Sequence, residues 1–450
     1  MRYSFTAAAL WAASAIADKR DLCSDGSTDD NGNWYCQKVT AITYTGVGGE
    51  GTFQRVTNMD SSSGSCSQSG QSYSGNISPL DREVSVHFRG PLQLYQFAAY
   101  TPSSSSSKNS KREEHVRRHA HAHGHGHAHG AHEKRQVGAE VYATIDGVLA
   151  SWVNEWSGEA TPSAPAASTT PTSVPATSPN GSPSTDSSTP ASHSSPSSSS
   201  SSDGSGWSRI AYYDSSSSTT EGLVFLNHYG GAGSGTFDNT FGSSLSYANE
   251  DGCGGASIAT TLKATTLPSS AEVVIFTDKQ CGDDGGDCGY YRPDTVAYHG
   301  FDGAEKAFFF EFQMPSTGQT AASKYDPVDM PAIWILNALI PRTLQYGQED
   351  CSCWTSGCGE FDLFEVLAAG DKRMKSTLHG NISGGDSDFF ERPVDAPIKA
   401  AMVLCNDNIY LKIIDNSTEF SEIMAQSMID EISKGTEQTE WLSLFSLSHH

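Results

Sequence analysis

Basic residues are scarce in this sequence of 450 residues. Its 28 lysines and arginines stand against 52 aspartates and glutamates, which gives a formal net charge of −24 at pH 7. Proteins that bind nucleic acids need a basic surface against the phosphates, so the charge balance argues against a nucleic-acid partner. A neutral polysaccharide is compatible with this charge, which also favours solubility.

Long hydrophobic runs are missing as well. No stretch approaches the roughly 18 consecutive apolar residues of a membrane-spanning helix. A shorter apolar run follows Arg2 and ends at Ala15-Ile16-Ala17, which is typical of a signal-peptide cleavage site. We interpret residues 1–17 as a signal peptide and expect a secreted protein. Residues 441–450 are too short and too polar for a lipid-anchor signal, so we expect no membrane anchor.

Ten cysteines remain to be explained. In an exported protein they are expected to form disulfides. Three precede residue 104 and seven follow residue 205, so either one disulfide joins the two blocks or each block keeps a free thiol. Zinc is a weaker alternative for Cys351, Cys353 and Cys358, because their spacing is not that of a zinc ribbon. We expect no metal and no cofactor.

Composition divides the first part of the chain into segments. Residues 21–103 are rich in Gly, Ser and Cys with short alternating runs, which predict a small disulfide-rich β module that residues 136–158 could extend. Residues 104–135 hold a His-rich tract between dibasic pairs, which we interpret as a processed spacer rather than a weak metal site. Residues 159–205 are almost entirely Ser, Thr, Pro and Ala, which is typical of a linker.

Residues 206–450 make up the largest segment. Short apolar runs at 222–226, 271–276 and 409–414 are separated by Gly- and Asp-rich turns and predict strands of a sandwich or jelly roll. Apolar residues at helical spacing predict one amphipathic helix over 419–434. The expected fold class is therefore all-β.

The hexapeptide 360–365 carries the main functional signal, because three carboxylates lie in an apolar run that is typical of a strand. Glu360 and Asp362 would share one face, whereas Glu365 would point to the other. One extra residue, a β-bulge, would bring Glu365 back to the first face. An isolated pattern of this kind more often reflects acids that face water. A bulged strand with all three acids together instead has the parts of a retaining glycosidase, whose nucleophile and acid/base lie about 5 Å apart. The negative charge of Asp362 would help to keep a neighbouring carboxyl protonated.

The surrounding segments resemble the active-site strands of glycoside hydrolase family 16, the laminarinase-like β-jelly rolls. The resemblance rests on the order of four elements, which are residues 307–315, residues 330–336, the acid motif, and residues 376–379. It implies Glu360 as the nucleophile, Asp362 as its helper and Glu365 as the acid/base.

Three further residues are candidates for substrate binding. Trp334 lies on the strand before the acid motif, where its ring could stack on a sugar or pack in the core. His379 lies on the next expected strand, where the family pattern has a histidine near the acids. Trp354 lies in a Cys-flanked loop that could line a cleft, although aromatic residues in such loops are as often packing residues.

The whole layout resembles a fungal cell-wall family of probable circularly permuted 1,3-β-glucanases, which join a Gly/Cys-rich N-terminal module to a family-16-like module. This resemblance implies a secreted endo-β-1,3-glucanase of the cell wall, with β-1,3-glucan as its partner, that acts in wall assembly and remodelling. It also implies a permuted, concanavalin-like jelly roll, in which residues 206–300 could supply the strands missing after Glu365.

Two alternatives to hydrolysis stay open. A glucan transglycosylase would use the same acids, and a non-catalytic glucan-binding wall protein would keep them as remnants. We expect a monomer, with N-glycosylation at the sequons of Asn381 and Asn416.

Overall fold

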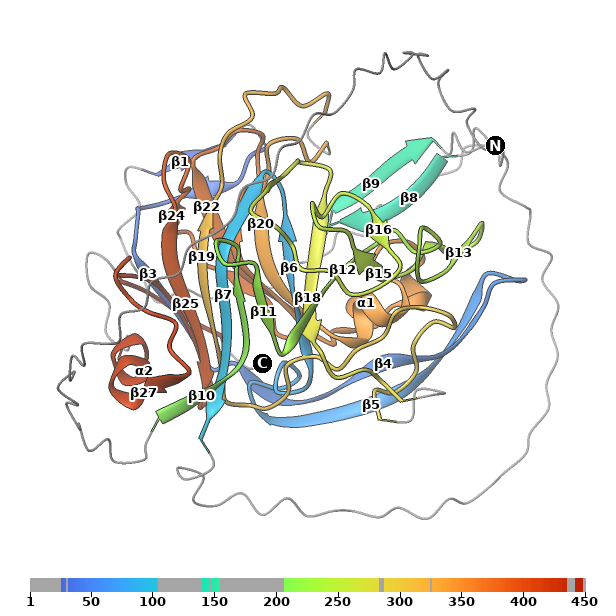
Figure 1. Ribbon diagram of the computed structural model, residues 1–450, viewed down its shortest axis with the longest axis horizontal. Helices are drawn as coiled ribbons and strands as arrows, with labels where there is room; N and C mark the ends of the chain where they lie inside the picture. The colour runs from blue at the N-terminus through green and yellow to red at the C-terminus, as the bar shows by residue number, and fades with distance from the viewer. Residues whose placement is uncertain are drawn as a thin grey trace, which may run out of the picture. The chain divides into compact units, whose positions relative to one another are not determined.

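The strands of the chain assemble mainly into two large β-sheets (Figure 1). The computed structural model describes residues 26–29, 31–103, 140–145, 148–153, 206–282, 287–323, 326–434 and 442–447. The predicted signal peptide, His-rich spacer and linker lie outside the described residues. Within the described ranges, no helix is long and apolar enough to cross a bilayer.

The first sheet has the strand order β11-β10-β7-β19-β25-β26-β3-β28, with β17 beside β7 and β27 beside β10. Its strands are β3 (Ala41–Thr45), β7 (Leu92–Pro102), β10 (Gly206–Asp214), β11 (Thr219–Glu221), β17 (Thr266–Leu267), β19 (Lys306–Gln313), β25 (Ile398–Cys405), β26 (Asn408–Ile414), β27 (Ile423–Ala425) and β28 (Leu442–Ser446). Its pairings are antiparallel except that of β28 with β3.

The second sheet has the order β16-β15-β12-β18-β6-β20-β21-β22-β23, with β24 beside β22. Its strands are β6 (Val84–Arg89), β12 (Leu223–Asn227), β15 (Ser246–Ala248), β16 (Gly255–Ala256), β18 (Glu272–Thr277), β20 (Ala332–Asn337), β21 (Glu360–Glu365), β22 (Arg373–His379), β23 (Gly384–Gly385) and β24 (Phe390–Glu391). All of its pairings are antiparallel.

Within the described ranges, the smaller elements are four two-stranded pairs, two helices and two 3-10 turns. The pairs are β1 (Ser27–Thr28) with β2 (Trp34–Tyr35), β4 (Gly48–Asp60) with β5 (Ser65–Asn76), β8 (Glu140–Ile145) with β9 (Val148–Val153), and β13 (Phe237–Asp238) with β14 (Gly242–Ser243). The described helices are α1 (Leu339–Thr343) and α2 (Gln426–Ile432), and the 3-10 turns are η2 (Glu349–Cys351) and η3 (Trp354–Ser356).

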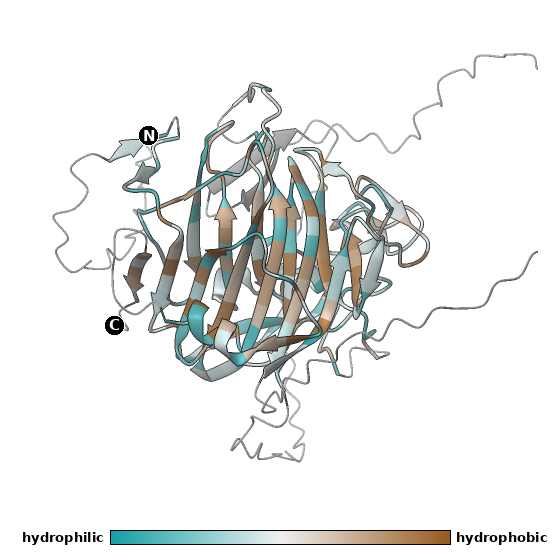
Figure 2. Ribbon diagram, turned by 60° about the vertical axis from the view of Figure 1, so that its left-hand side comes forward, coloured by the Kyte–Doolittle hydropathy of each residue, from teal (hydrophilic) through white to brown (hydrophobic). Residues whose placement is uncertain are grey.

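The two large sheets enclose a common apolar core. Successive residues of a strand point to opposite faces, so Phe308 and Phe310 of β19 enter this core while Phe309 faces the other way. Phe88 of β6 meets Phe310 from the opposite sheet, with ring centres 6.2 Å apart. Figure 2 shows the resulting alternation of apolar and polar residues along the strands. The prediction of an all-β, jelly-roll-like sandwich is confirmed.

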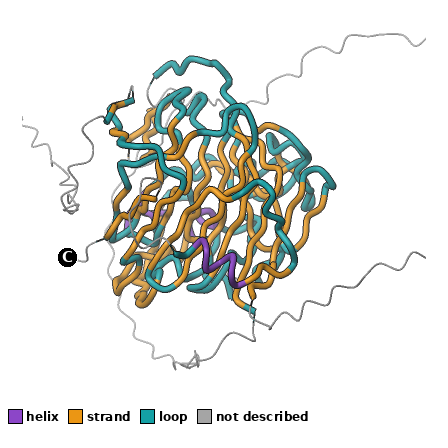
Figure 3. Tube along the Cα trace, turned by 90° about the vertical axis from the view of Figure 1, so that its left-hand side faces the viewer, coloured by secondary structure: helices purple, strands orange, loops and turns teal. Residues whose placement is uncertain are grey.

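Helix α2 covers part of the outer face of the first sheet (Figure 3). Ile429 and Ile432 of this helix pack in one cluster with Phe309. The predicted helix over 419–434 is too long, because residues 423–425 pair with β10 as strand β27. The helix therefore begins only at Gln426.

Strands from both ends of the chain are mixed within each sheet. β6 lies between β18 and β20, β7 between β10 and β19, and β3 between β26 and β28. The sequence assigned residues 21–103 and 206–450 to separate modules, and the structure corrects this assignment by placing both in one sandwich. Each segment alone would expose the unpaired edges of strands that lie inside the sheets. Residues 206–300 do supply strands β10 to β18, but interior strands also come from residues 41–102.

The disulfides follow one of the two predicted patterns. Cys66 in β5 is bonded to Cys351 in η2, so one disulfide joins the two cysteine blocks. Two others close short loops, Cys281–Cys288 and Cys353–Cys358. The weaker zinc alternative is wrong, because the three cysteines that it needed are all in disulfides. Among the described residues, Cys253 and Cys405 are free cysteines.

Candidate active site

The acid motif forms strand β21, and its pairing with β20 decides where the carboxylates point. Opposite partners are Leu336 with Glu360, Trp334 with Asp362, and Ala332 with Glu365. Five steps along β21 therefore match four along β20, and the register shifts between Asp362 and Glu365. This shift confirms the predicted β-bulge. Because residues opposite one another point to the same face, all three carboxylates share one face of the sheet.

Glu360 is held by an indole. The Nε1–H of Trp354 in η3 donates a hydrogen bond to Oε2 of Glu360. The Glu360 residue is 5 % exposed, and its side chain lines a pocket together with Trp354. A charge-assisted hydrogen bond of this kind fixes the orientation of the carboxylate.

Asp362 is paired with His379 on the next strand. Nε2 of His379 lies 2.9 Å from Oδ2 of Asp362. The imidazole of His379 also lies 6.1 Å from the ring of Trp354, measured between ring centres. His379 therefore hydrogen-bonds to Asp362 and also lies next to Trp354, the residue that holds Glu360.

Glu365 is paired with Arg89 of β6. The guanidinium donates a 3.1 Å hydrogen bond to Oε1 of Glu365, and its Nε–H donates to the carbonyl oxygen of Met330 at 2.9 Å. The same guanidinium lies 5.7 Å from the ring centre of Trp334. Arg89 thus brings a positive charge to the end of the acid row, next to the aromatic ring that faces the acids.

His87 lies on the same face of β6 as Arg89 and supports Trp334. The two rings are stacked, with centres 5.0 Å apart and planes 25° apart. Burial lowers the pKa of His87, so the imidazole is neutral near pH 7. Its Nδ1 lies 3.0 Å from Glu272 and its Nε2 lies 2.8 Å from the Ser85 hydroxyl. A neutral ring therefore donates from Nδ1 to the carboxylate and accepts from Ser85 at Nε2.

Glu272 is a largely buried carboxylate, with its side chain 15 % exposed, and it accepts several hydrogen bonds. Tyr346 donates its hydroxyl at 2.7 Å and Gln345 its amide at 2.8 Å, in addition to His87. Burial alone would raise the pKa of Glu272, but the hydrogen bond from His87, the nearby His228 and the hydrogen bond from Tyr346 outweigh it and hold the pKa at about 2. Glu272 is therefore ionised at any neutral or mildly acidic pH.

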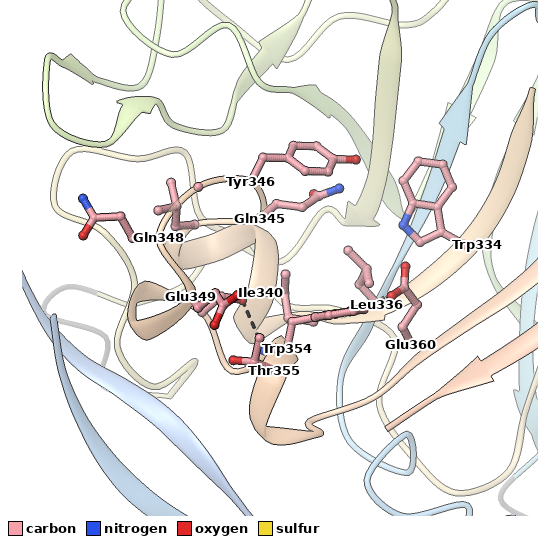
Figure 4. Close-up of a pocket in the computed structure, with 13 residues that line it drawn as sticks. Trp334, Leu336, Ile340, Gln345, Tyr346, Gln348, Glu349, Trp354, Thr355 and Glu360 are labelled. Atoms are coloured by element: carbon pink, nitrogen blue, oxygen red, sulfur yellow. Dashed lines mark hydrogen bonds between the residues drawn. The ribbon is translucent and has the colours of Figure 1, made fainter. Parts of the chain in front are cut away.

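A pocket opens beside the acid row (Figure 4). The empty space within it, counted together with the open solvent at its mouth, is about 600 Å³. Trp334 and Glu360 come from the sheet at one side, and Tyr346, Gln345 and Gln348 come from the loop at the other. The full lining is Trp334, Leu336, Ile340, Leu344, Gln345, Tyr346, Gly347, Gln348, Glu349, Ser352, Trp354, Thr355 and Glu360. Aromatic rings with two amides and two carboxylates are a typical lining for a sugar.

The loop that carries Trp354 is tightly fixed. The Cys353–Cys358 disulfide closes it, and Gly357 ends η3 with φ = 85°. A Cβ on Gly357 would lie 2.4 Å from Oδ1 of Asn381, so only glycine fits this turn. The indole is thereby held next to Glu360.

The candidates named from the sequence are brought together around β21. Trp334 lies on the acid face and lines the pocket, whereas the neighbouring Ile333 and Ile335 enter the core between the sheets. Trp354 and His379 are hydrogen-bonded to Glu360 and Asp362. Of the acids only Glu360 lines the pocket, while Asp362 and Glu365 are 3 % and 4 % exposed.

Sequence reasoning missed Arg89, His87, Glu272 and Tyr346. The signal for two of them was available, because the alternating run at 83–88 is typical of a strand, and His87 and Arg89 would share a face if that strand continued for one more residue. Their proximity to the acids could not be seen, because it depends on the pairing of β6 with β20.

One group of potential metal ligands occurs among the described residues. Atoms of Cys281, Cys288 and His299 all lie within 4.8 Å of one another. The two cysteines are bonded to each other and so offer no thiolate. His299 is instead paired with Glu83 at 2.5 Å and Asp287 at 2.9 Å, and we assign no metal to this group.

Comparisons with known proteins give consistent matches along the chain. The profile described as "Cell wall protein YJL171C/Tos1, C-terminal" matches residues 205–432, and its N-terminal counterpart matches residues 40–102. A Candida albicans protein named "Probable circularly permuted 1,3-beta-glucanase TOS1" is 42 % identical, with 90 % of this chain and 93 % of the relative covered.

Two further relatives carry similar names. The Saccharomyces cerevisiae TOS1 protein is 42 % identical over 91 % of this chain and 93 % of its own length. An Arthroderma benhamiae protein named "Probable circularly permuted 1,3-beta-glucanase" is 40 % identical over 99 % of this chain and 100 % of its own length. No solved structure matches the chain.

Proposed function

Because this chain belongs to the YJL171C/Tos1 family of cell wall proteins, we propose that it is a retaining endo-1,3-β-glucanase of the fungal cell wall. The names of its relatives, probable circularly permuted 1,3-beta-glucanases, support this substrate and reaction. The proposed role is the assembly and remodelling of the wall, with β-1,3-glucan as the substrate.

One observation carries the proposal. The bulge in β21 gathers Glu360, Asp362 and Glu365 on a single face, beside a pocket lined by Trp334 and Trp354. A fold gains nothing in stability from three nearly buried carboxylates side by side, because like charges repel one another in a low dielectric. Such a cluster instead suits double displacement at a sugar, which needs two carboxyl groups with different tasks.

We assign to the three acids the roles that the resemblance to glycoside hydrolase family 16 implies. Glu360, oriented by Trp354, attacks the anomeric carbon while Glu365 protonates the leaving oxygen, and the glycosidic bond breaks. Glu365 then takes a proton from water, which displaces Glu360 from the sugar and releases a product with retained configuration. Asp362, tied to His379, supplies the negative charge between the two glutamates.

The test is to compare the full chain with its Glu360→Gln variant on laminarin, a 1,3-β-glucan. We expect release of oligosaccharides by the wild type and a loss on the order of a thousandfold or more in the variant. Glu431→Gln, an exposed glutamate on α2, is the matched control and should leave activity unchanged. A wild type that releases nothing and binds laminarin no better than Glu360→Gln would instead support a non-catalytic glucan-binding protein.

Transglycosylation is the second candidate reaction, and the aromatic lining of the pocket supports it. Two aromatic residues, Trp334 and Trp354, line the pocket together with Glu360 and could hold a second glucan as acceptor. That acceptor would displace Glu360 in place of water. Incubation with 1,3-linked oligosaccharides separates the two reactions, because transfer yields products longer than the substrate and hydrolysis does not.

A further inference from the structure

We propose that the side of the pocket beyond Trp334 is a second sugar-binding subsite, for a glucosyl unit remote from the cleaved bond, and that Glu272 positions its walls. This inference rests on the proposed function, because it assumes that a 1,3-β-glucan lies across the second sheet. It concerns residues of β6, β18 and the loop after α1 rather than the acids of β21.

The order of strands places this region next to the acids. In the second sheet, the strands that follow β21 towards one edge are β20, β6 and β18, in that order. Trp334 on β20 lies opposite His87 on β6, and Arg89 on β6 lies opposite Glu272 on β18. A polysaccharide that crosses the strands from Glu360 therefore passes Trp334 before it reaches the region of Glu272.

Glu272 connects three separate parts of the pocket wall. It accepts hydrogen bonds from Tyr346 and Gln345, both of which line the pocket. It also pairs with His87, whose ring is stacked on Trp334. One largely buried carboxylate thus orients Tyr346, Gln345 and His87 directly, and the indole of Trp334 through His87.

The chemistry of these walls suits a pyranose. Trp334 and Tyr346 offer aromatic faces to the C–H groups of a sugar ring, and the Tyr346 residue is 37 % exposed. Next to them, Gln345 and Gln348 line the same pocket, and their side-chain amides can exchange hydrogen bonds with the hydroxyl groups of a sugar.

The alternative is that this network only stabilises the loop after α1. The two explanations differ in how the effect of a substitution depends on substrate length. Loss of a remote subsite weakens the binding of long oligosaccharides and leaves the binding of short ones unchanged. A loosened loop disturbs Trp354 and Glu360 and lowers activity on all substrates alike.

The experiment uses the full chain and 1,3-linked gluco-oligosaccharides from two to seven sugars long. Binding is followed by tryptophan fluorescence, and hydrolysis is measured separately. Tyr346→Ala is expected to raise KM and Kd for the longer oligosaccharides by about five- to twentyfold, with kcat and the values for the shortest ones unchanged. Glu272→Gln should show the same length dependence. Tyr229→Ala, which removes a tyrosine of similar exposure (38 %) outside the pocket lining, should change neither value.

The outcomes are distinguishable. An equal loss at all lengths, or no change in Tyr346→Ala, overturns the subsite even if the wild type is an active glucanase. Length-dependent binding by a wild type that cleaves nothing supports the subsite and refutes the proposed catalysis. If Glu272→Gln does not fold, the surface variant Tyr346→Ala still decides.

Discussion

Arg89 on β6 and Glu365 on β21 form a 3.1 Å ion pair across the intervening strand β20. The two residues are 276 positions apart in the chain. Their side chains are only 11 % and 6 % exposed, so solvent and salt screen this pair less than a pair on the surface. A segment near the N-terminus therefore sets the electrostatic environment of the proposed acid/base.

Replacing Arg89 with glutamine should change the pH dependence of activity. Removal of a neighbouring positive charge makes it easier for a carboxyl group to keep its proton. If Glu365 is the general acid, the alkaline limb of the kcat/KM profile should move to higher pH by about one unit. Arg373→Gln is the control, because Arg373 pairs with Asp371 instead. An alkaline limb that stays in place or moves to lower pH would exclude Glu365 from this role.

Replacing Trp354 with phenylalanine removes the N–H that orients Glu360 and keeps an aromatic ring in the pocket. Hydrogen bonds to charged groups contribute about 1.5–3 kcal/mol, so kcat on laminarin should fall about ten- to a hundredfold. KM should change less, because the ring is retained. Trp207→Phe, in the cluster on the outer face of the first sheet, controls for loss of a tryptophan. A variant with a raised KM and an unchanged kcat would assign Trp354 to substrate binding alone.

Cutting the chain in the linker at 159–205 should leave one folded particle. The strands on either side belong to the same sheets, and Cys66–Cys351 joins them covalently. A protein with an engineered protease site there should elute unchanged from gel filtration after cleavage, and laminarin activity should persist. On denaturing gels, two bands should separate only after reduction. Dissociation of the two cleaved pieces under native conditions in the Cys66→Ser, Cys351→Ser variant, in which this disulfide no longer joins them, would refute the shared sandwich.

The disulfide that joins the two pieces should also matter for stability. The Cys66→Ser, Cys351→Ser double variant is expected to lose about 2–5 kcal/mol in free energy of unfolding, because the bond spans 285 positions. The matched Cys281→Ser, Cys288→Ser variant opens a bond that spans 7 positions and should lose less. Urea unfolding measures both. An equal loss in the two variants would show that constraint of the unfolded chain is not the main contribution.

Acid should destabilise the protein partly through Glu272. Its pKa is lowered from 4.5 in the unfolded chain to about 2 in the folded protein. A lowered folded pKa means that the carboxylate contributes stability above about pH 4.5 and that this contribution is lost as the pH falls towards 2. In urea titrations, Glu272→Gln should be less stable than the wild type at pH 6 by on the order of 2–3 kcal/mol. The two proteins should converge near pH 2. A constant difference across this range would mean that Glu272 does not titrate as described.

The acid site shows how far local pattern reaches. The carboxylates at 360, 362 and 365 can share one face of a strand only if the strand has one extra residue, a β-bulge. The pairing of β21 with β20 contains this bulge. The sequence placed Trp334 on the strand before the acid motif, but it did not show which face of that strand the indole occupies. A tryptophan can equally pack in the core or stack on a sugar. The helix over 419–434 was overestimated because the pairing of residues 423–425 with β10 overrides their helical periodicity.

Local patterning is enough to predict the all-β class, the acid strand with its bulge, and the two blocks of cysteines. These follow from the alternation and spacing of neighbouring residues. The interior positions of β3, β6 and β7 in the sandwich, and the places of Arg89, His87 and Glu272 around the acid row, are visible only in the folded protein. The reason is that pairing between strands hundreds of residues apart depends on which edges and faces fit together, and no local pattern specifies that choice.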